Sequence, residues 1–285
     1  MSKTKTPSVS IVIPVYNEGE HLAACLSAIA AQTMTPMQVI VVDNNSSDNT
    51  VAIARRFPLV TVLHEPRQGV VHARNRGFDA ARGEIIGRID ADTLLPATWV
   101  AQVMELFADA DLAAVSGAPD YYDFGLRRTA NRIDYVLRGY LDRMLGDANF
   151  LWGANMAVRR SAWQGVRADL CADAGLHEDF DLGIHLQARG HRVDYASDLL
   201  AQISGRRIDS SFAAYVRYSL VSPQTYAAHG LAARRYMYPV IAICWACYLP
   251  GRLLYRGYDP GIQRFSLERL LSLDTARVDP TTNIV

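Results

Sequence analysis

The N-terminal part of the chain alternates between short apolar runs rich in β-branched residues and segments whose apolar residues recur at helical spacing. Most of these runs end in a polar loop or at a proline, as strands do. We expect strands over residues 9–13, 38–42, 60–63 and 84–89, and helices over residues 21–32, 50–57 and 71–81. Repeated strand–helix units predict an α/β fold with a Rossmann-like, mostly parallel sheet flanked by helices. Its ligand site should lie beyond the carboxyl ends of the strands.

The second half of the chain is mostly helical in pattern. Residues 131–145 and 180–189 predict helices, residues 192–195 predict a further strand, and helical, aromatic-rich patterns follow from residue 212. Between residues 200 and 270, nine arginines stand against three acidic residues. We therefore expect a helical, basic C-terminal extension that either favours an anionic partner or forms a solvated surface.

The overall charge and the cysteines limit the class of protein. Lysine plus arginine and aspartate plus glutamate each number 29, so the composition does not favour nucleic acid as a partner. The cysteines Cys25, Cys171, Cys244 and Cys247 are scattered and too few for a disulfide framework, which favours a reducing compartment. Cys244 and Cys247 form a C-x-x-C pair inside an apolar run, and we interpret them as packing residues rather than zinc ligands. With no apolar signal-peptide stretch at the start, a cytoplasmic location is expected.

An apolar stretch over residues 240–249 raises the question of membrane contact. It is followed by Pro250 and falls short of the ~18–20 residues that a spanning helix needs. A buried core helix is the interpretation that we favour. The alternative is a helix at the inner face of the cell membrane, because arginines flank the stretch at positions 234, 235, 252 and 256.

A pair of carboxylates, Asp90 and Asp92, directly follows the predicted strand over residues 84–89. The polar segments 16–18 and 43–44 also follow strands, so the three loops should converge on one site. Hard cations such as Mg²⁺ and Mn²⁺ prefer oxygen ligands of this kind, although a capped turn after a strand would show the same residues. No G-x-G-x-x-G follows the first strand and the sequence has no G-x-x-x-x-G-K-[ST], which argues against a dinucleotide dehydrogenase and a P-loop enzyme.

Seven short motifs occur in order along the chain. They are residues 9–18 (VSIVIPVYNE), 39–50 (VIVVDNNSSDNT), 73–77 (ARNRG), 81–84 (ARGE), 89–92 (IDAD), 153–155 (GAN) and 177–179 (HED). The ordered set closely resembles the family 2 glycosyltransferases of the GT-A fold, over roughly residues 8–203. The resemblance implies an inverting transfer of a sugar from a nucleotide-diphosphate donor, with a divalent cation, Mn²⁺ or Mg²⁺, at the acidic pair.

The resemblance also implies which residues bind the nucleotide sugar. Pro14, Tyr16 and Glu18 match the motif that borders the nucleoside, and Asp43 matches the acid that accepts a hydrogen bond from the base. A carboxylate can accept from an N–H of uracil, thymine or guanine, whereas the ring nitrogens of adenine offer no donor. A UDP-, GDP- or dTDP-sugar is therefore expected. Arg74 matches a position near the base and phosphates. The alternative interpretation is that Arg74 lies on a solvated helix face and binds no ligand.

The metal and the diphosphate are assigned in the same way. Asp92 matches the direct metal ligand, and Asp90 matches a residue that contacts the ribose or the metal. Some relatives place an additional histidine ligand after the HED helix, where this chain has Arg206 and Arg207. We expect one of these arginines, with Arg206 preferred, to contact the diphosphate, because a guanidinium matches phosphate geometry.

On the acceptor side, the resemblance implies that Asp179 is the general base and that Glu178 supports it or contacts the acceptor. A positioned carboxylate is needed because a hydroxyl is a poor nucleophile until its proton is taken. Gly153 and Asn155 match the loop beside the donor sugar and acceptor, while Trp152 either stacks on a sugar ring or packs in the core.

Three further polar residues are expected to be structural. His177 and His229 are weak candidates for metal ligands, since lone histidines more often serve packing. Asp181 is expected to be a surface charge or a helix N-terminal charge.

Together these observations predict a catalytic domain over residues 1–205, with a nucleotide half over about 8–92 and an acceptor half over about 93–205. Residues 206–285 form the C-terminal extension. The predicted enzyme moves a sugar onto a hydroxyl of a carbohydrate or lipid-linked acceptor, in polysaccharide, glycolipid or cell-envelope synthesis. A nucleotidyltransferase and a non-catalytic nucleotide-sugar-binding subunit are the alternatives.

Overall fold

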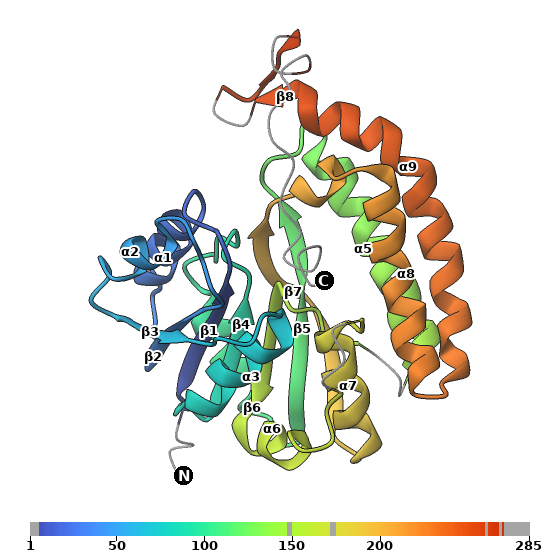
Figure 1. Ribbon diagram of the computed structural model, residues 1–285. Helices are drawn as coiled ribbons and strands as arrows, with labels where there is room; N and C mark the ends of the chain where they lie inside the picture. Colours follow the sequence, from blue (N-terminus) through green and yellow to red (C-terminus); the bar gives the residue numbers. More distant parts are fainter. Residues whose placement is uncertain (1–5, 147–149, 172–174, 260–261, 268–269, 271–285) are drawn as a thin grey trace.

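The computed structural model describes residues 6–146, 150–171, 175–259, 262–267 and 270. One seven-stranded sheet has the order β3-β2-β1-β4-β6-β5-β7 (Figure 1). Its strands are β1 (Val9–Val15), β2 (Gln38–Asp43), β3 (Val60–His64), β4 (Ile85–Ile89), β5 (Leu112–Tyr121), β6 (Asn155–Arg159) and β7 (Arg192–Ile203). A small second sheet pairs β8 (Tyr258–Asp259) with β9 (Arg264–Phe265).

The helices lie between these strands and after them. They are α1 (Leu22–Ala30), α2 (Thr50–Ala54), α3 (Val70–Ala80), α4 (Trp99–Leu106), α5 (Arg127–Leu145), α6 (Arg160–Val166), α7 (Glu178–Ala188), α8 (Phe212–Ala228) and α9 (Met237–Gly257). Two short 3-10 helices, η2 (Arg206–Asp209) and η3 (Ala232–Tyr236), precede α8 and α9.

The N-terminal half of the sheet has the predicted parallel arrangement. β1 lies between β2 and β4 and pairs in parallel with both, and β2 pairs in parallel with β3. All residues of β4 are buried, as expected for a strand that is covered on both faces, and its apolar run is interrupted by Arg88. The alternation of strands and helices predicted for this half is confirmed.

The second half contains elements that the sequence patterns did not predict. β6 runs antiparallel between β4 and β5, and β5 pairs in parallel with β7. β5 was missed because Gly117 and Pro119 weaken its strand pattern, and β6 was missed although its first residue, Asn155, belongs to the motif that was assigned to a loop. α4 and α6 were also missed. β7 continues to Ile203, well beyond the predicted strand over residues 192–195.

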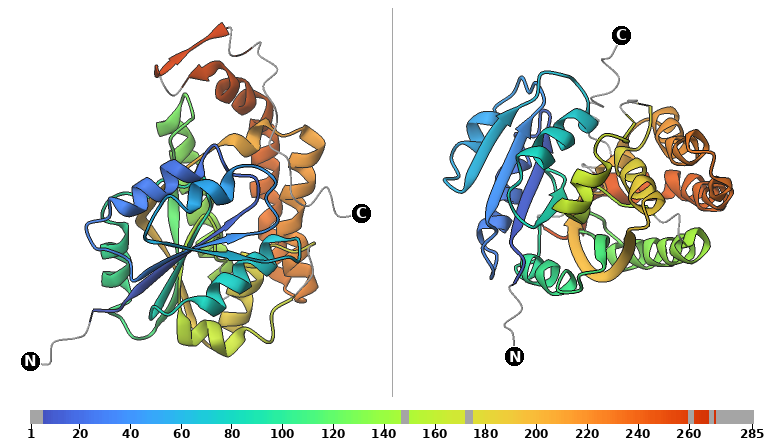
Figure 2. Two further views of the ribbon diagram at one scale, coloured as in Figure 1. Left: turned by 60° about the vertical axis from the view of Figure 1, so that its left-hand side comes forward. Right: turned by 90° about the horizontal axis from the view of Figure 1, so that it is seen from below.

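Helices cover both faces of the sheet (Figure 2). α1, α2 and α4 pack on one face, where Leu26 and Trp99 are fully buried in the first apolar core. α3, α6 and α7 pack on the other, around Phe78, Trp163 and Leu186. The carboxyl ends of β1, β2 and β4 lie at one edge of the sheet, where a ligand site was expected.

α5, α8 and α9 form a further layer beside the sheet (Figure 1). A third apolar cluster joins this layer to α7, and it contains Leu141 of α5, Phe180 of α7, Tyr226 of α8 and Ile241 of α9. The C-terminal helices therefore rest on the helix that begins with Glu178 and Asp179.

The expectation that residues 240–249 form a buried core helix is wrong. The helical segment Ala232–Gly257 is long and apolar enough to cross a membrane by length and composition, and 17% of the residues in its most apolar window are buried. The helix continues through Pro250, which lies on its exposed side. α9 contacts the rest of the protein along one face and leaves a wide apolar face uncovered by the described residues.

Candidate active site

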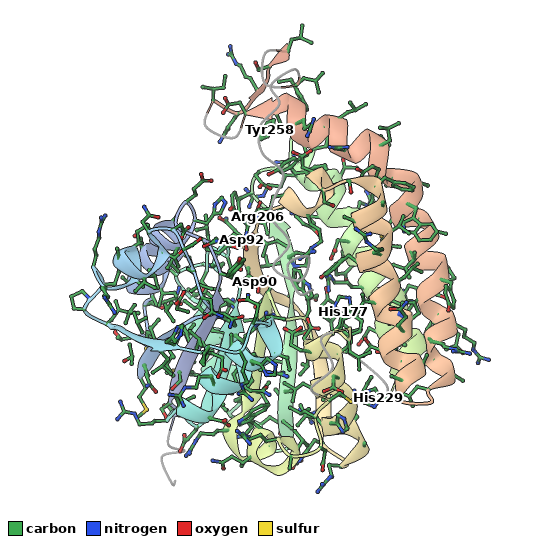
Figure 3. The ribbon with its side chains drawn as sticks, viewed as in Figure 1. Asp90, Asp92, His177, Arg206, His229 and Tyr258 are labelled. Carbon is green, nitrogen blue, oxygen red and sulfur yellow. The ribbon has the colours of Figure 1, made fainter. Side chains whose placement is uncertain are left out.

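Three segments that are distant in sequence meet at the carboxyl edge of the sheet: the loop after β1, the loop after β4, and η2. Figure 3 shows Asp90, Asp92 and Arg206 gathered there. Arg206 Nη2 lies 2.6 Å from Glu18 Oε1, and its Nε lies 2.8 Å from Asp92 Oδ2. Although burial opposes it, the charges of Asp92 and Glu18 raise the pKa of Arg206. The guanidinium is thus held as a cation between two buried carboxylates.

The loop after β1 is held in place by its own polar groups. Asn17 adopts a left-handed conformation with φ 53°, which asparagine tolerates better than most residues. Its side-chain oxygen accepts a hydrogen bond of 2.8 Å from the Ser47 amide in the loop after β2. The Glu18 amide donates to Thr50 Oγ1 at 2.8 Å, and the Glu18 carbonyl accepts from the first turn of α1. The Glu18 carboxylate is therefore fixed while its backbone anchors two loops.

Arg88 is a site residue that the sequence analysis missed. Its Nη2 lies 3.1 Å from Asp90 Oδ1 and 3.2 Å from Glu178 Oε1, so it links the acidic pair after β4 to the start of α7. Although burial opposes it, the charges of Asp90, Glu178 and Asp179 raise the pKa of Arg88. An arginine inside the apolar strand β4, two residues before the acidic pair, was the signal that could have revealed it.

Asp179 is buried at the start of α7 and accepts hydrogen bonds on both carboxylate oxygens. The Gly153 amide donates to Oδ2 at 2.7 Å, and the Phe180 amide donates to Oδ1 at 2.9 Å. Burial raises the pKa of Asp179, against the opposing effects of Arg88 and of these amides. A carboxylate with a raised pKa binds a proton more readily, as a general base requires.

Glu178 lies beside Asp179 with its side chain 10% exposed. Burial raises the pKa of Glu178, the charge of Asp179 raises it further, and Arg88 and Arg74 oppose both effects. The alternative of a solvated helix face for Arg74 is wrong, because Arg74 is fully buried. Its Nη1 donates to the Glu178 carbonyl at 3.1 Å, and burial lowers its pKa to about 10.

The remaining nucleotide-side candidates surround the end of the sheet. Pro14 and Tyr16 are half-buried at the end of β1. Asp43 ends β2, where Oδ1 accepts from the Ser46 amide at 3.1 Å and Oδ2 lies 3.3 Å from His64 Nδ1. Asp43 therefore shares a sheet edge with Glu18, as the strand pattern predicted.

Asn155 and Trp152 have structural contacts. Asn155 is fully buried; its Nδ2 donates to the Leu199 and Ala118 carbonyls, and its Oδ1 accepts from Trp99 Nε1 at 2.9 Å. In this conformation the Asn155 side chain is closed off from an acceptor. The guanidinium of Arg138 lies 4.0 Å from the centre of the Trp152 ring, so one face of the ring is already covered.

The other residues named from the sequence make packing contacts or lie elsewhere in the fold. The Arg207 guanidinium stacks 3.7 Å from the centre of the Tyr218 ring. His177 packs between Phe180 and Tyr218, and burial lowers its pKa to about 4, as fits a structural histidine. His229 lies well away from Asp90 and Asp92 (Figure 3).

The acidic group at the sheet edge has the chemistry to hold a divalent cation. Glu18, Asp90 and Asp92 lie close enough together that each contributes to raising the pKa of the buried Cys25, after burial itself. Glu18 Oε2 is buried and has no hydrogen-bond partner among the described residues. Oxygen donors of this kind suit Mg²⁺ and Mn²⁺, so the residues fit such an ion.

Sequence comparison places the chain in a known family. The family described as glycosyl transferase family 2 matches residues 10–167, which include the loops after β1, β2 and β4. The chain belongs to glycosyl transferase family 2. Among its relatives, the uncharacterized glycosyltransferase YibD of Escherichia coli is 33% identical over 111 residues, or 38% of this chain and 32% of YibD. Glycosyltransferase AglE of Haloferax volcanii is 29% identical over 167 residues, or 56% of this chain and 55% of AglE. The matches thus span about a third to just over half of these relatives.

The fold agrees with this family 2 assignment. The mannosyltransferase PcManGT from Pyrobaculum calidifontis, solved in complex with GDP-Man and Mn²⁺, superposes with a TM-score of 0.64 at 22% sequence identity. The superposition covers 93% of this chain and 78% of that one. The GT-A fold with a C-terminal helical region, predicted from the motifs, is confirmed.

Proposed function

We propose that this family 2 member is an inverting glycosyltransferase, which transfers a sugar from a nucleotide-diphosphate donor to an acceptor hydroxyl. One observation carries the proposal: the carboxylates of Glu18, Asp90 and Asp92 lie at the sheet edge, and Arg88 joins Asp90 to Glu178, the neighbour of Asp179. A cation-binding group and a candidate base are therefore parts of one polar network. PcManGT, which shares the fold, holds GDP-Man and Mn²⁺.

The donor is bound at the carboxyl ends of β1, β2 and β4. Asp43 accepts from an N–H of the base, Pro14 and Tyr16 border the nucleoside, and Glu18 faces the phosphates and their cation. A UDP-, GDP- or dTDP-sugar satisfies Asp43, because each of these bases carries an N–H donor. Arg74 acts indirectly, since its guanidinium is buried behind Glu178 and holds the start of α7.

Asp92 and Asp90, with Glu18, would hold the divalent cation, Mn²⁺ or Mg²⁺. When bound, the cation neutralises the charge that develops on the departing nucleotide diphosphate. In the structure, Arg206 forms ion pairs with Asp92 and Glu18 and so neutralises part of their negative charge. With a donor in place, Arg206 turns toward the diphosphate, for which its planar guanidinium is suited.

Asp179 acts on the acceptor. As the acceptor oxygen forms its bond to the anomeric carbon, its proton passes to Asp179 and the bond from that carbon to the diphosphate oxygen breaks. Attack opposite to the leaving group inverts the anomeric centre. The Gly153 amide and Arg88 hold Asp179 and Glu178 in place. A carbohydrate or lipid-linked acceptor fits this chemistry, in polysaccharide, glycolipid or cell-envelope synthesis.

Contact with a membrane surface on the cytoplasmic side is part of the proposal. The exposed face of α9 is uncharged and includes Tyr238, Ile243, Leu249 and Leu253, which are 44–63% exposed. Two of the four flanking arginines are already engaged, because Arg252 and Arg256 pair with Asp209. Arg234 and Arg235 are exposed and are the cationic residues best placed to meet anionic headgroups.

The decisive experiment separates donor binding from transfer. A panel of UDP-, GDP- and dTDP-sugars with Mn²⁺ should reveal one donor that is bound and slowly hydrolysed.

Asp179→Asn should lower transfer by ~10²- to 10⁴-fold with donor affinity nearly unchanged, because the missing group takes a proton in the transition state. Asp92→Ala should instead remove Mn²⁺-dependent donor binding. Transfer should be lost as the pH is lowered, because a protonated Asp179 cannot accept the acceptor proton. The loss should occur at a higher pH than for an ordinary aspartate, since burial raises the pKa of Asp179.

Unchanged transfer by Asp179→Asn would refute its assignment as the base. Equal Mn²⁺-dependent donor affinity in Asp92→Ala and wild type would refute the metal assignment. A wild type that binds a nucleotide sugar with Mn²⁺ yet neither transfers nor hydrolyses it would favour the non-catalytic alternative.

A further inference from the structure

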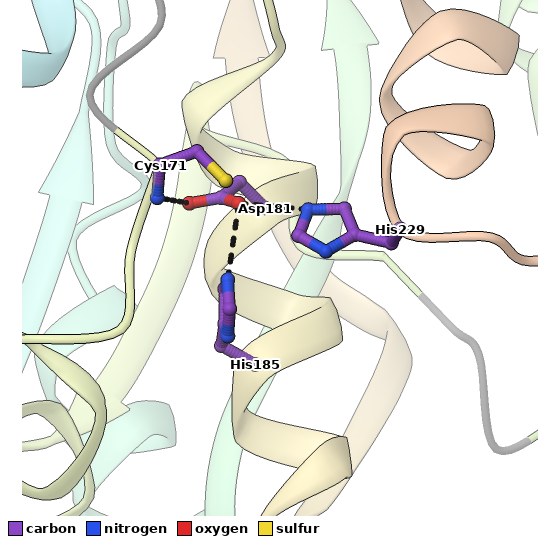
Figure 4. A group of neighbouring side chains, drawn as sticks. All are labelled: Cys171, Asp181, His185 and His229. Atoms are coloured by element: carbon purple, nitrogen blue, oxygen red, sulfur yellow. Dashed lines mark hydrogen bonds and ion pairs between the residues drawn. The ribbon is translucent and has the colours of Figure 1, made fainter.

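A second cluster of ligand-type side chains lies on the far side of α7 from the sheet edge. Cys171 follows α6, Asp181 and His185 lie one turn apart on α7, and His229 caps the end of α8 (Figure 4). The ligand atoms of these four residues all lie within 4.8 Å of one another. His229 Nε2 is 2.9 Å and His185 Nε2 is 3.4 Å from the same oxygen, Asp181 Oδ1.

These separations approach those of a tetrahedral zinc site. Zinc bonds of ~2.0–2.3 Å to nitrogen, oxygen and sulfur place neighbouring ligand atoms about 3.3–3.7 Å apart. The two imidazole nitrogens already point toward one carboxylate oxygen from different elements (Figure 4). Small rotations of His185, His229 and the Cys171 side chain would close the remaining distance. A thiolate, a carboxylate and two imidazoles form a ligand set that zinc prefers.

Asp181 is a buried carboxylate, and a positive charge beside it would stabilise its ionised form. Its side chain is 1% exposed, and its ion-pair partners among the described residues are His185 and His229. Its other oxygen accepts a hydrogen bond of 3.1 Å from the Cys171 amide. Burying a carboxylate is costly unless a charge or a metal compensates it. Of the two expectations for Asp181, the surface charge is wrong, and the helix N-terminal charge agrees with its place in the first turn of α7.

His185 supplies an independent indication of a ligand. Its Nε2 atom is buried and has no hydrogen-bond partner among the described residues, although Asp181 Oδ1 lies 3.4 Å away. A buried ring nitrogen in that state costs free energy, and a metal bond to its lone pair would remove the cost. Without a metal, both imidazoles would be expected to donate an N–H hydrogen bond to Asp181. His185 Nε2 lies 3.4 Å from Asp181 Oδ1 but does not form that hydrogen bond.

We propose that Cys171, Asp181, His185 and His229 bind one Zn²⁺ ion that fastens the end of α8 and the segment after α6 to α7. The thiolate and the carboxylate together balance the charge of Zn²⁺, and the thiol proton is released to solvent on binding. The site is separate from the acidic group at the sheet edge, from which His229 is remote (Figure 3). Its role is structural, because it would fix the helix that starts with Glu178 and Asp179.

The test uses the full chain, purified without chelators and with any histidine tag removed. Elemental analysis should find one zinc per chain, retained in the Asp92→Ala background. Chelation followed by Co²⁺ should give the thiolate-to-cobalt charge-transfer band and the visible spectrum of a tetrahedral site. Zn²⁺ should raise the Tm of the chelated protein, since it binds the folded state.

Matched variants identify the ligands. Cys171→Ser should remove the charge-transfer band, and its Zn²⁺ affinity should fall by more than the ~10- to 100-fold that loss of an outer-shell partner costs. Cys247→Ser, at an exposed cysteine on α9, should leave both unchanged. His229→Gln should weaken zinc binding similarly and add an open, water-bound position to the cobalt spectrum. If Cys171→Ser does not fold, the test is the thiolate-to-cobalt charge-transfer band of the wild type. The proposal requires this band to be present in the wild type and unchanged in Cys247→Ser.

Several results would overturn the proposal. Wild-type protein could bind no zinc, or its cobalt spectrum could lack a thiolate band. Zinc could also be lost in Asp92→Ala but kept in Cys171→Ser, which would place the ion at the sheet edge. None of these results bears on glycosyl transfer, which the donor assay tests separately.

Discussion

Gly153 and Arg88 show how closely individual residues are matched in the active site. A Cβ atom at Gly153 would stand 1.1 Å from Arg88 Nη1, so no side chain fits beside the guanidinium. Gly153→Ala should displace Arg88 from Asp90 and Glu178 and shift the amide that binds Asp179. We expect a loss of ~1–3 kcal/mol in unfolding free energy, typical of overpacking, and a larger relative loss of transfer. Chemical denaturation and the donor assay measure the two effects.

Gly165 provides the control for this prediction. It lies in α6, and a Cβ added there would meet no heavy atom within 4 Å. Gly165→Ala should therefore be neutral or stabilise the protein by about 0.5–1 kcal/mol, because alanine favours a helix. If Gly153→Ala and Gly165→Ala changed stability and transfer equally, the position of Arg88 would not depend on the absence of a side chain at Gly153.

At the residue level, the sequence allowed part of the site to be predicted. Loops that follow parallel strands meet at one edge, so the convergence of Glu18, Asp43 and Asp92 could be inferred from strand order. The contacts of Arg88 and the burial of Arg74 could not, because they depend on where the start of α7 lies relative to β4 and α3. The functional roles of these residues remain predictions.

At the level of elements, Asn155 joins three parts of the sheet layer. Its amide connects β6 to α4 through Trp99, to β5 through Ala118 and to β7 through Leu199. Asn155→Ala would leave the buried Trp99 N–H and strand carbonyls without this partner, at ~1–3 kcal/mol for each unsatisfied group. We expect the unfolding free energy to fall by at least about 2 kcal/mol, with the urea m-value unchanged.

A double-mutant cycle with Trp99→Phe separates this bond from packing. Phenylalanine removes the indole donor, so Asn155→Ala should cost less in the Trp99→Phe background than in wild type. Strictly additive losses would show that the Trp99–Asn155 bond contributes nothing. A folded Asn155→Ala protein whose main defect is a raised KM for the acceptor would instead support direct acceptor contact.

The same elements show why β5 and β6 escaped sequence-based prediction. β1 and β2 are almost entirely buried and read as apolar runs, and short β-branched or isoleucine-rich runs also mark β3 and β4, so the sequence pattern identifies all four strands. β6 enters the sheet antiparallel between β4 and β5, a pairing that depends on contacts distant in sequence. β6 begins at Asn155, the last residue of the 153–155 motif, which suggested a loop beside the sugar.

On the scale of the whole molecule, the ordered motifs gave the correct family, but the sequence analysis missed two features. The search for zinc ligands considered Cys244 and Cys247 because they are close in sequence. The ligand-type cluster instead joins Cys171 to Asp181, His185 and His229, which only the packing of α7 against the end of α8 brings together. The apolar stretch was judged too short because Pro250 was expected to end the helix.

The uncovered face of α9 leads to the last prediction, at the scale of the whole protein. The wild type should sediment with vesicles that contain anionic lipid and should stay largely bound at high salt, because burial of Leu249 and Leu253 does not depend on charge. The double substitution Leu249→Glu with Leu253→Glu should lower partitioning by at least about tenfold, since each leucine contributes ~1.5–3 kcal/mol on full burial.

Met37→Glu is the matched control for this measurement. Met37 is 56% exposed and precedes β2, far along the chain from α9, whereas Leu249 and Leu253 are 63% and 52% exposed. If the α9 face binds the membrane, Met37→Glu should partition like the wild type. A wild type that stays in the supernatant with every vesicle would contradict membrane contact. Self-association that the Leu249→Glu and Leu253→Glu pair abolishes would instead assign this face to a second copy of the chain.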